Sequence, residues 1–341
     1  MNKPQNWLRI EAASEIETIL KVIHHQVRTV LRKKGAIIAV SGGIDSSVCA
    51  ALCTQALGND HVLALSLPER DSSSDSMRLG HQLADALGIK LIKEDITPIL
   101  NGAKCYELQL EAIRQIFPEY GEGWKHKVTL PSILENDRLN LSYLTVQNPD
   151  GVQKSSRIPF HAYLQLIAAT NLKQRIRKMT EYLYADRLNF AVCGTPNRLE
   201  YDQGFFVKQG DGSADFKPIA HLYKSQVYQL AEALGIPEEI RKRPPTTETF
   251  SLPQTQEEFY FSLPYGQMDI CLYGFNHNIP STETAHEAQL TSEQVERVYK
   301  DIEKKRRTTL PLHLPPLLIQ DVVEINDLIE SAIHQSKEVQ F

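Results

Sequence analysis

The chain has 341 residues, of which 42% are hydrophobic and 23% charged, and its formal net charge at pH 7 is −5. These values are typical of a globular protein with one large domain or two small ones, and they provide no general basic surface for nucleic acid. The five cysteines lack metal-site spacing, and we find neither a signal-peptide core nor a run of ~20 apolar residues, so we expect a cytoplasmic protein that binds neither nucleic acid nor membrane.

Helices and short apolar strands alternate over the first hundred residues. Residues 15–32 have apolar side chains at helical spacing and predict an amphipathic helix. Buried strands are predicted at 36–40, 62–67 and 90–96, with helices after the first two. This alternation predicts an α/β fold, a doubly wound, Rossmann-like parallel sheet flanked by helices. Ligands of such sheets bind at the carboxyl ends of the strands.

A polar, glycine-containing loop joins the first strand to its helix. The backbone amides and the dipole of the first helical turn favour an anion, and glycines let the backbone approach phosphate oxygens. Asp45 is suited to hold a magnesium ion against such phosphates. An ordinary N-capped helix is the alternative interpretation, and the missing Gly-Lys-Ser/Thr excludes a Walker A loop. The candidate anion-binding residues are Ser41, Gly42, Gly43, Asp45, Ser46 and Ser47.

The middle of the chain holds an interruption between two regular parts. Arg70 lies beside the serines 72–74, and two interpretations are equally open. The serines only cap a helix, or Arg70 contacts a nucleotide. Residues 117–159 lose all long periodicity and predict an insertion into the domain. A helix at 160–186 and a strand at 189–195 then restore the pattern. Thr195 and Glu200 follow this strand, which places the Glu200 carboxylate where it can reach the same magnesium as Asp45.

The last part contains a second unusual stretch and a helical tail. Three glycines exclude a regular helix over residues 204–215, where Lys208 and two aspartates suit a charged ligand. A helix is predicted at 225–234, after Lys224, and residues 243–248 form a polar turn. Residues 254–280 are expected to be irregular. A helix is predicted to begin after Thr291 and to end at the basic run 304–307. Pro311 is expected to break the chain before a tail at 311–341 with a helix at 322–335.

In order and spacing, these motifs resemble those of the NAD synthetases, a branch of the ATP pyrophosphatase (PP-loop) superfamily. The resemblance covers roughly residues 15–100 and 171–309 and makes the whole chain a single synthetase domain, residues 1–341. Pro196-Asn197-Arg198 replaces the family's Asp-His-Ala, and Lys304 replaces its histidine. The motifs that carry the resemblance are Ser-Gly-Gly-Ile-Asp-Ser at 41–46, Gly-Thr-Pro-Asn-Arg-Leu-Glu at 194–200, the stretch 204–215, Lys-Ser-Gln at 224–226 and Pro-Thr-Thr-Glu at 245–248.

The resemblance implies an adenine nucleotide alpha-hydrolase-like fold and assigns roles to individual residues. It implies that Asp45 and Lys224 are catalytic and that Asp45 and Glu200 bind Mg²⁺. ATP would be bound by Ser41, Gly42, Gly43, Asp45, Ser46, Ser47, Thr195, Lys224 and Thr246. Nicotinic acid adenine dinucleotide (deamido-NAD) would contact Arg175, Lys208, Asp215, Lys304 and Lys305. From pattern alone, Arg175 and Arg177 would be a solvated basic surface, and they cannot share one helix face.

The implied activity is ATP-dependent amidation of deamido-NAD to NAD through an acyl-adenylate, with release of AMP and pyrophosphate. About thirty-five residues precede the loop strand, too few for the nitrilase-like amidase domain of glutamine-dependent relatives. Ammonia, free or delivered by a separate amidase subunit, is therefore the expected nitrogen donor. Members of the family are similar in forming homodimers, and we expect the apolar helix 160–184 to supply the contact.

Three alternatives remain at this stage. A PP-loop amide synthetase acting on a different carboxylate would keep the same chemistry, although residues 208–215 match the family's dinucleotide contacts. A non-catalytic nucleotide-binding protein would be favoured by loss of Asp45 or Glu200, and both are present. A tRNA-thiolating enzyme would need paired functional cysteines and a basic surface, and the sequence shows neither.

Overall fold

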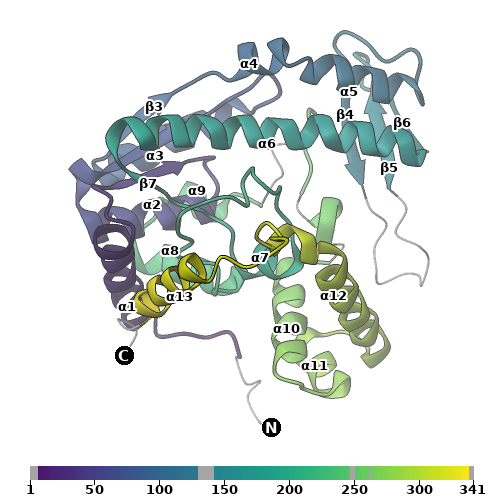
Figure 1. Ribbon diagram of the computed structural model, residues 1–341. Helices are drawn as coiled ribbons and strands as arrows, with labels where there is room; N and C mark the ends of the chain where they lie inside the picture. Colours follow the sequence, from purple (N-terminus) through teal and green to yellow (C-terminus); the bar gives the residue numbers. More distant parts are fainter. Residues whose placement is uncertain (1–6, 130–141, 246–249, 256, 262, 338–341) are drawn as a thin grey trace.

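The computed structural model describes residues 7–129, 142–245, 250–255, 257–261 and 263–337, and its main sheet is parallel and has four strands (Figure 1). The strand order is β3-β2-β1-β7, so the chain winds in both directions from β1. Ala36 pairs with Val62 on one side and with Ala191 on the other. The strands are β1 (Ala36–Ala39), β2 (Val62–Ser66), β3 (Lys90–Lys93) and β7 (Ala191–Val192).

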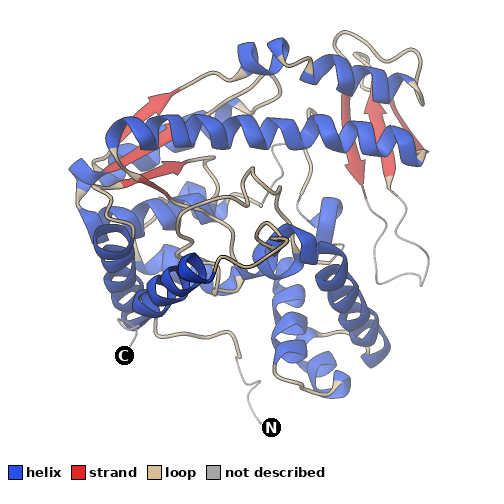
Figure 2. Cartoon of the chain, viewed as in Figure 1, coloured by secondary structure: helices blue, strands red, loops and turns tan. Residues whose placement is uncertain are grey.

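Helices cover both faces of this sheet, as the alternation of strands and helices predicts (Figure 2). Successive strand residues point to opposite faces, so Ile38 packs in one core and Ile37 in the other. The first core contains α1 (Ala12–His25), η1 (Gln26–Val30), α2 (Ile44–Leu57), α3 (Ser74–Leu87), α8 (Lys224–Ala233) and α9 (Glu238–Lys242). The second contains α4 (Thr97–Gly102), α5 (Cys105–Arg114) and α6 (Phe160–Leu188), and the short turn η2 (Asn59–His61) precedes β2.

The insertion at 117–159 contains a small antiparallel sheet, which the loss of long periodicity in this stretch did not predict. Its strands are β4 (Lys125–Thr129), β5 (Tyr143–Gln147) and β6 (Gln153–Arg157), in the order β4-β5-β6. Alternate residues of β4 and β5 are buried, among them Val128 and Leu144, and they pack on α5 and the start of α6. Each alternation spans only five residues, which is too short to stand out among the turn-forming residues around it.

A helical layer follows the central sheet, and here two expectations were wrong. Residues 254–280 are not irregular throughout, because α10 spans Tyr265–Asn276 and buries Met268 and Leu272. Gly274 lies where a Cβ atom would meet the hydroxyls of Thr284 and Tyr299, so a glycine in this helix lets its neighbours approach closely. The other elements are α7 (Arg198–Gln203), η3 (Glu257–Phe261), α11 (Ser281–Ala288) and α12 (Ser292–His313).

The helix α12 does not end at the basic run 304–307, as predicted, and it is not broken at Pro311 but continues to His313. Helix ends need partners for their last carbonyl groups, and Lys208 Nζ donates to Pro311 O at 2.7 Å and to Leu314 O at 3.0 Å. This remote lysine therefore stabilises a turn that local sequence disfavours. The predicted tail helix is present as α13 (Val323–Lys337). Within the described ranges, no helix combines the length and apolar character that crossing a membrane requires.

The inner side of β4 carries a buried histidine. The His126 side chain is 2% exposed, and burial lowers its pKa to about 3. Its Nδ1 lies 2.9 Å from the Tyr120 hydroxyl, and its Nε2 lies 3.1 Å from Gln109 Nε2. The neutral imidazole thus joins the insertion to α5.

This burial makes a prediction about acid stability. Unfolded His126 takes up a proton as the pH falls below about 6.5, whereas folded His126 does not, so protonation favours the unfolded state. We expect His126→Gln to be less stable than the wild type at pH 7.5. The difference in free energy of unfolding between the wild type and the variant should be about 2 kcal/mol smaller at pH 5. Urea unfolding at both pH values measures this, with exposed His161→Gln as control. A difference that does not change with pH would contradict it.

Candidate active site

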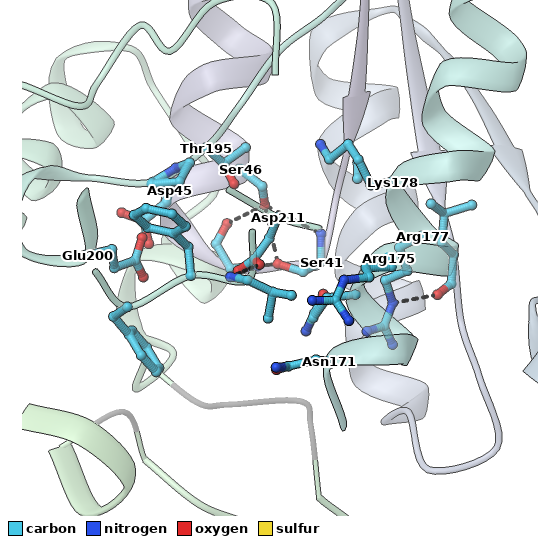
Figure 3. A pocket seen from close by; sticks show the side chains of 18 of the residues that line it. Ser41, Asp45, Ser46, Asn171, Arg175, Arg177, Lys178, Thr195, Glu200 and Asp211 are labelled. Atoms are coloured by element: carbon cyan, nitrogen blue, oxygen red, sulfur yellow. Dashed lines mark hydrogen bonds between the residues drawn. The ribbon is translucent and has the colours of Figure 1, made fainter. Parts of the chain in front are cut away.

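A cavity of about 600 Å³ opens at the carboxyl ends of β1, β2 and β7, where the fold predicts a ligand site. Figure 3 shows its side chains converging from the loop after β1, from α6 and from the segments that follow β7. Of the residues predicted from the sequence, the cavity wall contains Ser41, Gly43, Asp45, Ser46, Arg175, Thr195, Glu200 and Lys208.

The loop after β1 is held by its own serines. The Ser46 and Ser47 hydroxyls both donate to Gly43 O, at 3.1 and 2.8 Å. The Gly43 amide donates to Ser41 Oγ at 3.3 Å, and the Ser41 amide donates to Ser46 Oγ at 3.4 Å. The loop therefore leads directly into the first turn of α2, whose amides are available to an anion. Ser47 is buried behind this turn and does not line the cavity.

Gly42 lies behind the cavity wall, and its contacts explain the glycine. Its φ is +72°, and a Cβ atom would lie 2.9 Å from Ser76 O and 3.1 Å from Arg243 Nη1. Arg243 donates to Ser41 O at 3.3 Å and to Ser76 Oγ at 2.9 Å, which fixes the loop from outside. Gly42 thus permits a left-handed turn and close packing of α3, whereas Gly43 faces the cavity.

Asp45 is bonded to two residues from distant parts of the chain. Its Oδ2 accepts a hydrogen bond and ion pair from Lys224 Nζ, and its Oδ1 accepts from Asn197 Nδ2 at 3.1 Å. Lys224 is 2% exposed. Burial alone would lower the pKa of Lys224, but the negative charges of Asp45 and Glu200 raise it above its usual value. The result is a buried, charged ammonium group beside the candidate phosphate loop.

Glu200 lies on the cavity wall beside Asp45 (Figure 3). Burial and the nearby negative charge of Asp45 raise its pKa to about 8. Asn197 fixes this residue at the start of α7, because Asn197 Oδ1 accepts from the Glu200 amide and Glu200 Oε2 accepts from the Asn197 amide, both at 3.2 Å. The unusual turn at 196–198 therefore positions both carboxylates. Two adjacent carboxylates of this kind suit a divalent cation that also binds phosphate.

Other predicted residues make contacts within the protein. Asp215 lies off the cavity wall, where it accepts from the Val192 amide at 2.7 Å and from the Tyr182 hydroxyl at 3.2 Å. Lys305 Nζ forms an ion pair with Asp301 Oδ2 at 2.8 Å and donates to Tyr260 O at 2.9 Å, and Lys304 is exposed. Thr246 lies outside the described residues.

Two arginines of α6 reach the cavity together, although they are two residues apart. Arg175 Nε donates to Lys208 O at 3.2 Å, and Arg177 Nε donates to Leu67 O at 3.1 Å. Both arginines line the cavity, which the interpretation as a solvated basic surface did not include, and they bond to different segments of the chain. Arg70 instead lies over the Tyr106 ring, 3.7 Å from its centre, and does not line the cavity.

Sequence reasoning missed two charged residues of the wall, Lys178 and Glu181, whereas Asp211 is one of the two aspartates expected to suit a charged ligand. Lys178 Nζ and Glu181 Oε2 form a buried ion pair at 2.6 Å, and Asp211 accepts from the Val207 amide at 2.7 Å. Burial raises the pKa of Glu181 and of Asp211. A lysine and a glutamate three apart on a helix are usually a surface pair, so the sequence held no signal that this pair is buried.

The comparisons with known proteins agree on one family. The family profile described as NAD synthase matches residues 15–115 and 133–309. The NH(3)-dependent NAD(+) synthetase of Mesorhizobium japonicum is 58% identical over 317 residues, which cover 93% of this chain and 99% of the relative. Its counterpart in Thermotoga maritima is 36% identical over 277 residues, or 80% of this chain and 90% of the relative.

Solved structures show the same fold at lower identity. The NH3-dependent NAD synthetase from Campylobacter jejuni superposes with a TM-score of 0.59 at 21% identity, and the match covers 91% of this chain and 100% of that one. The NMN synthetase from Francisella tularensis gives the same TM-score and identity, with coverage of 92% and 100%. At this identity the likeness concerns the fold.

The buried Lys178–Glu181 pair gives a prediction about stability. Lys178→Met should lower the free energy of unfolding by about 3 kcal/mol, because it leaves the Glu181 carboxyl buried without its cation. The double variant Lys178→Met/Glu181→Leu should recover most of this loss. Lys21→Met, which removes an exposed pair with Glu17, serves as control and should cost less than about 1 kcal/mol. Urea unfolding at pH 7 measures all three, and a fully stable Lys178→Met would refute the expectation.

Proposed function

The chain belongs to the NAD synthase family, and we propose that it converts deamido-NAD to NAD, with ATP as co-substrate and ammonia as nitrogen donor. The reaction is a carbon–nitrogen ligation that releases AMP and pyrophosphate. The observation that carries this proposal within the structure is that Asp45 lines one cavity with Glu200 and the anion-binding loop and contacts buried Lys224, which does not itself line the cavity. A different carboxylate substrate or a non-catalytic role is not favoured, because the relatives are named for this activity over nearly their whole length.

The chemistry follows from the weakness of a carboxylate as an acyl donor, since oxide is a poor leaving group. A carboxylate oxygen of deamido-NAD attacks the α-phosphorus of ATP, the bond to the bridging oxygen breaks, and pyrophosphate leaves. Ammonia then attacks the carbonyl carbon of the acyl-adenylate, AMP departs with the former carboxylate oxygen, and one proton is released. The first step brings two anions together, so fixed positive charge is needed where they meet.

We propose that the residues around Asp45 meet this need. The amides of the first turn of α2 and the hydroxyls of Ser41 and Ser46 would bind the ATP phosphates, with Thr195 and Thr246 completing the nucleotide site. Lys224 is already charged and buried, so it would neutralise developing charge without reorganisation. Gly42 and Ser47 would support the loop from behind.

The pair Asp45 and Glu200 fits a magnesium ion. Burial and the neighbouring Asp45 carboxylate raise the pKa of Glu200, and a divalent cation would relieve the repulsion between the two carboxylates. In the part of the chain that the structure describes, no group of three or more His, Cys, Asp or Glu side chains forms a metal site. Two carboxylates with ATP phosphates are a usual ligand set for Mg²⁺. When bound, the ion would polarise phosphate oxygens and assist the departure of pyrophosphate.

The opposite end of the cavity is our candidate for deamido-NAD. Arg175 and Lys208 line it, and we propose that they contact the dinucleotide. Asp215 would act by holding Tyr182 and the end of β7 in place. Lys304 and Lys305 would complete the site from α12. Lys305 would have to give up its hydrogen bond to the Tyr260 carbonyl in exchange for one to the substrate.

We also propose that the enzyme forms a cytoplasmic homodimer and uses free ammonia or ammonia from a separate amidase subunit. The exposed surface of α6 supports the dimer, because Phe160, Met179 and Leu183 are each more than half exposed there. The cysteines are all free and buried, which suits a reducing compartment.

One assay tests the activity directly. Purified protein is given ATP, Mg²⁺, ammonium and deamido-NAD, and NAD and AMP are measured. We expect one AMP for each NAD, and no NAD when ammonium is omitted. ATP binding without NAD formation would refute the proposal. Nicotinic acid mononucleotide replaces deamido-NAD in a parallel reaction and tests whether the smaller acid is preferred.

Asp45→Asn tests the residue at the centre of the site. The amide cannot hold Lys224 or Mg²⁺ as the carboxylate does, so we expect kcat to fall at least about 100-fold, equivalent to about 2–4 kcal/mol of barrier. Circular dichroism should remain that of the wild type, and Asp85→Asn on the exposed side of α3 is the control. Turnover within tenfold of the wild type would remove Asp45 from the mechanism.

A further inference from the structure

The antiparallel sheet of the insertion is joined to a distant segment of the chain. β4 is an edge strand, and edge strands present backbone groups that need partners. The Leu252 amide donates to His126 O at 3.0 Å, and the His126 amide donates to Ser251 Oγ at 2.9 Å. The Gln254 side-chain amide donates to Val128 O. Residues 251–254 therefore lie along the outer edge of β4.

His126 strengthens this connection from the inside of the sheet. Its Nδ1 lies 3.2 Å from Ser251 Oγ as well as 2.9 Å from the Tyr120 hydroxyl. The Phe250 ring packs edge-on against the imidazole, with 5.6 Å between the ring centres. The hydroxyl of Ser251 thus contacts both the backbone and the side chain of a fully buried residue.

The same segment continues to the wall of the cavity. Phe259 and Tyr260 of η3 line the cavity. The Tyr260 hydroxyl donates to Gln203 O at 2.6 Å, and its ring stacks on Phe205 with 4.6 Å between the centres. We call residues 250–255 and 257–261 the wall segment. It is fixed at one end by β4 and at the other by α7 and its neighbours.

We propose that the β4–β6 sheet anchors the wall segment, with Ser251 and His126 as positioning residues that set the affinity for deamido-NAD. Neither residue lines the cavity, so both act through Phe259 and Tyr260. A wall that is ordered before binding spares the ligand the entropic cost of ordering it. Loosening the anchor therefore weakens substrate binding and leaves the chemical step unchanged. The inference rests on the proposed function, because the ligand is that reaction's substrate.

Ser251→Ala provides the test, since it removes one hydroxyl and little volume. We expect KM for deamido-NAD to rise about fivefold to tenfold, the effect of losing one or two hydrogen bonds, with kcat within twofold. Ser251→Thr keeps a hydroxyl and should restore KM to within twofold. The matched control is Ser155→Ala on β6, whose hydroxyl accepts from Thr145 Oγ1 at 3.1 Å within the same sheet. It should behave as the wild type.

Hydrogen exchange of the backbone amides gives a second measurement that does not depend on catalysis. Residues 250–255 should exchange faster in Ser251→Ala than in the wild type, and saturating deamido-NAD should restore protection. Faster exchange with unchanged KM, or a fall in kcat alone, would overturn the role in affinity. Unchanged exchange would overturn the anchor itself. A wild-type protein that makes no NAD would refute the proposed function, and the exchange data would still decide whether the sheet anchors the segment.

Discussion

The ion pair between Asp45 and Lys224 is the contact on which the arrangement of the site depends. These residues are 179 positions apart, and each lies in the first turn of a helix that packs on the same face of the sheet. Asp269 holds the second helix in place, because its carboxylate accepts from the Lys224 amide at 3.2 Å and from the Ser225 amide at 2.6 Å. A charged lysine at 2% exposure is stable only beside carboxylates. Burial of Lys224 therefore requires that the start of α8 lie against the Asp45 carboxylate at the start of α2.

The sequence predicted the central sheet and the anion-binding loop because both depend on residues that are neighbours in the chain. β1, β2 and the start of α2 have continuous apolar runs and local turn signals. The missed features depend on tertiary contacts instead. Local spacing could not show that the Lys178–Glu181 pair is buried, or that Lys208 extends α12 beyond Pro311.

The motifs predicted which distant residues line the same cavity, which the pattern of apolar residues alone did not. Ser41, Asp45, Thr195 and Glu200 meet at one cavity although the chain between Asp45 and Thr195 contains the whole insertion. A long α6 makes this possible, since its first turns pack with the insertion and its later turns with the central sheet. The insertion is thereby attached to the same helix that supplies Arg175 to the cavity.

The contact of Lys208 with the end of α12 has a thermodynamic consequence. Its ammonium group donates to the carbonyls of Pro311 and Leu314, while Leu312 between them lines the cavity. An anion that takes over one of these two N–H donors displaces a carbonyl, so its observed affinity is the difference between two sets of interactions. By the same linkage, binding of such an anion to Lys208 and order in the last turn of α12 would oppose each other to an equal extent. The C-terminal end of this helix is thus an internal competitor for the site it borders.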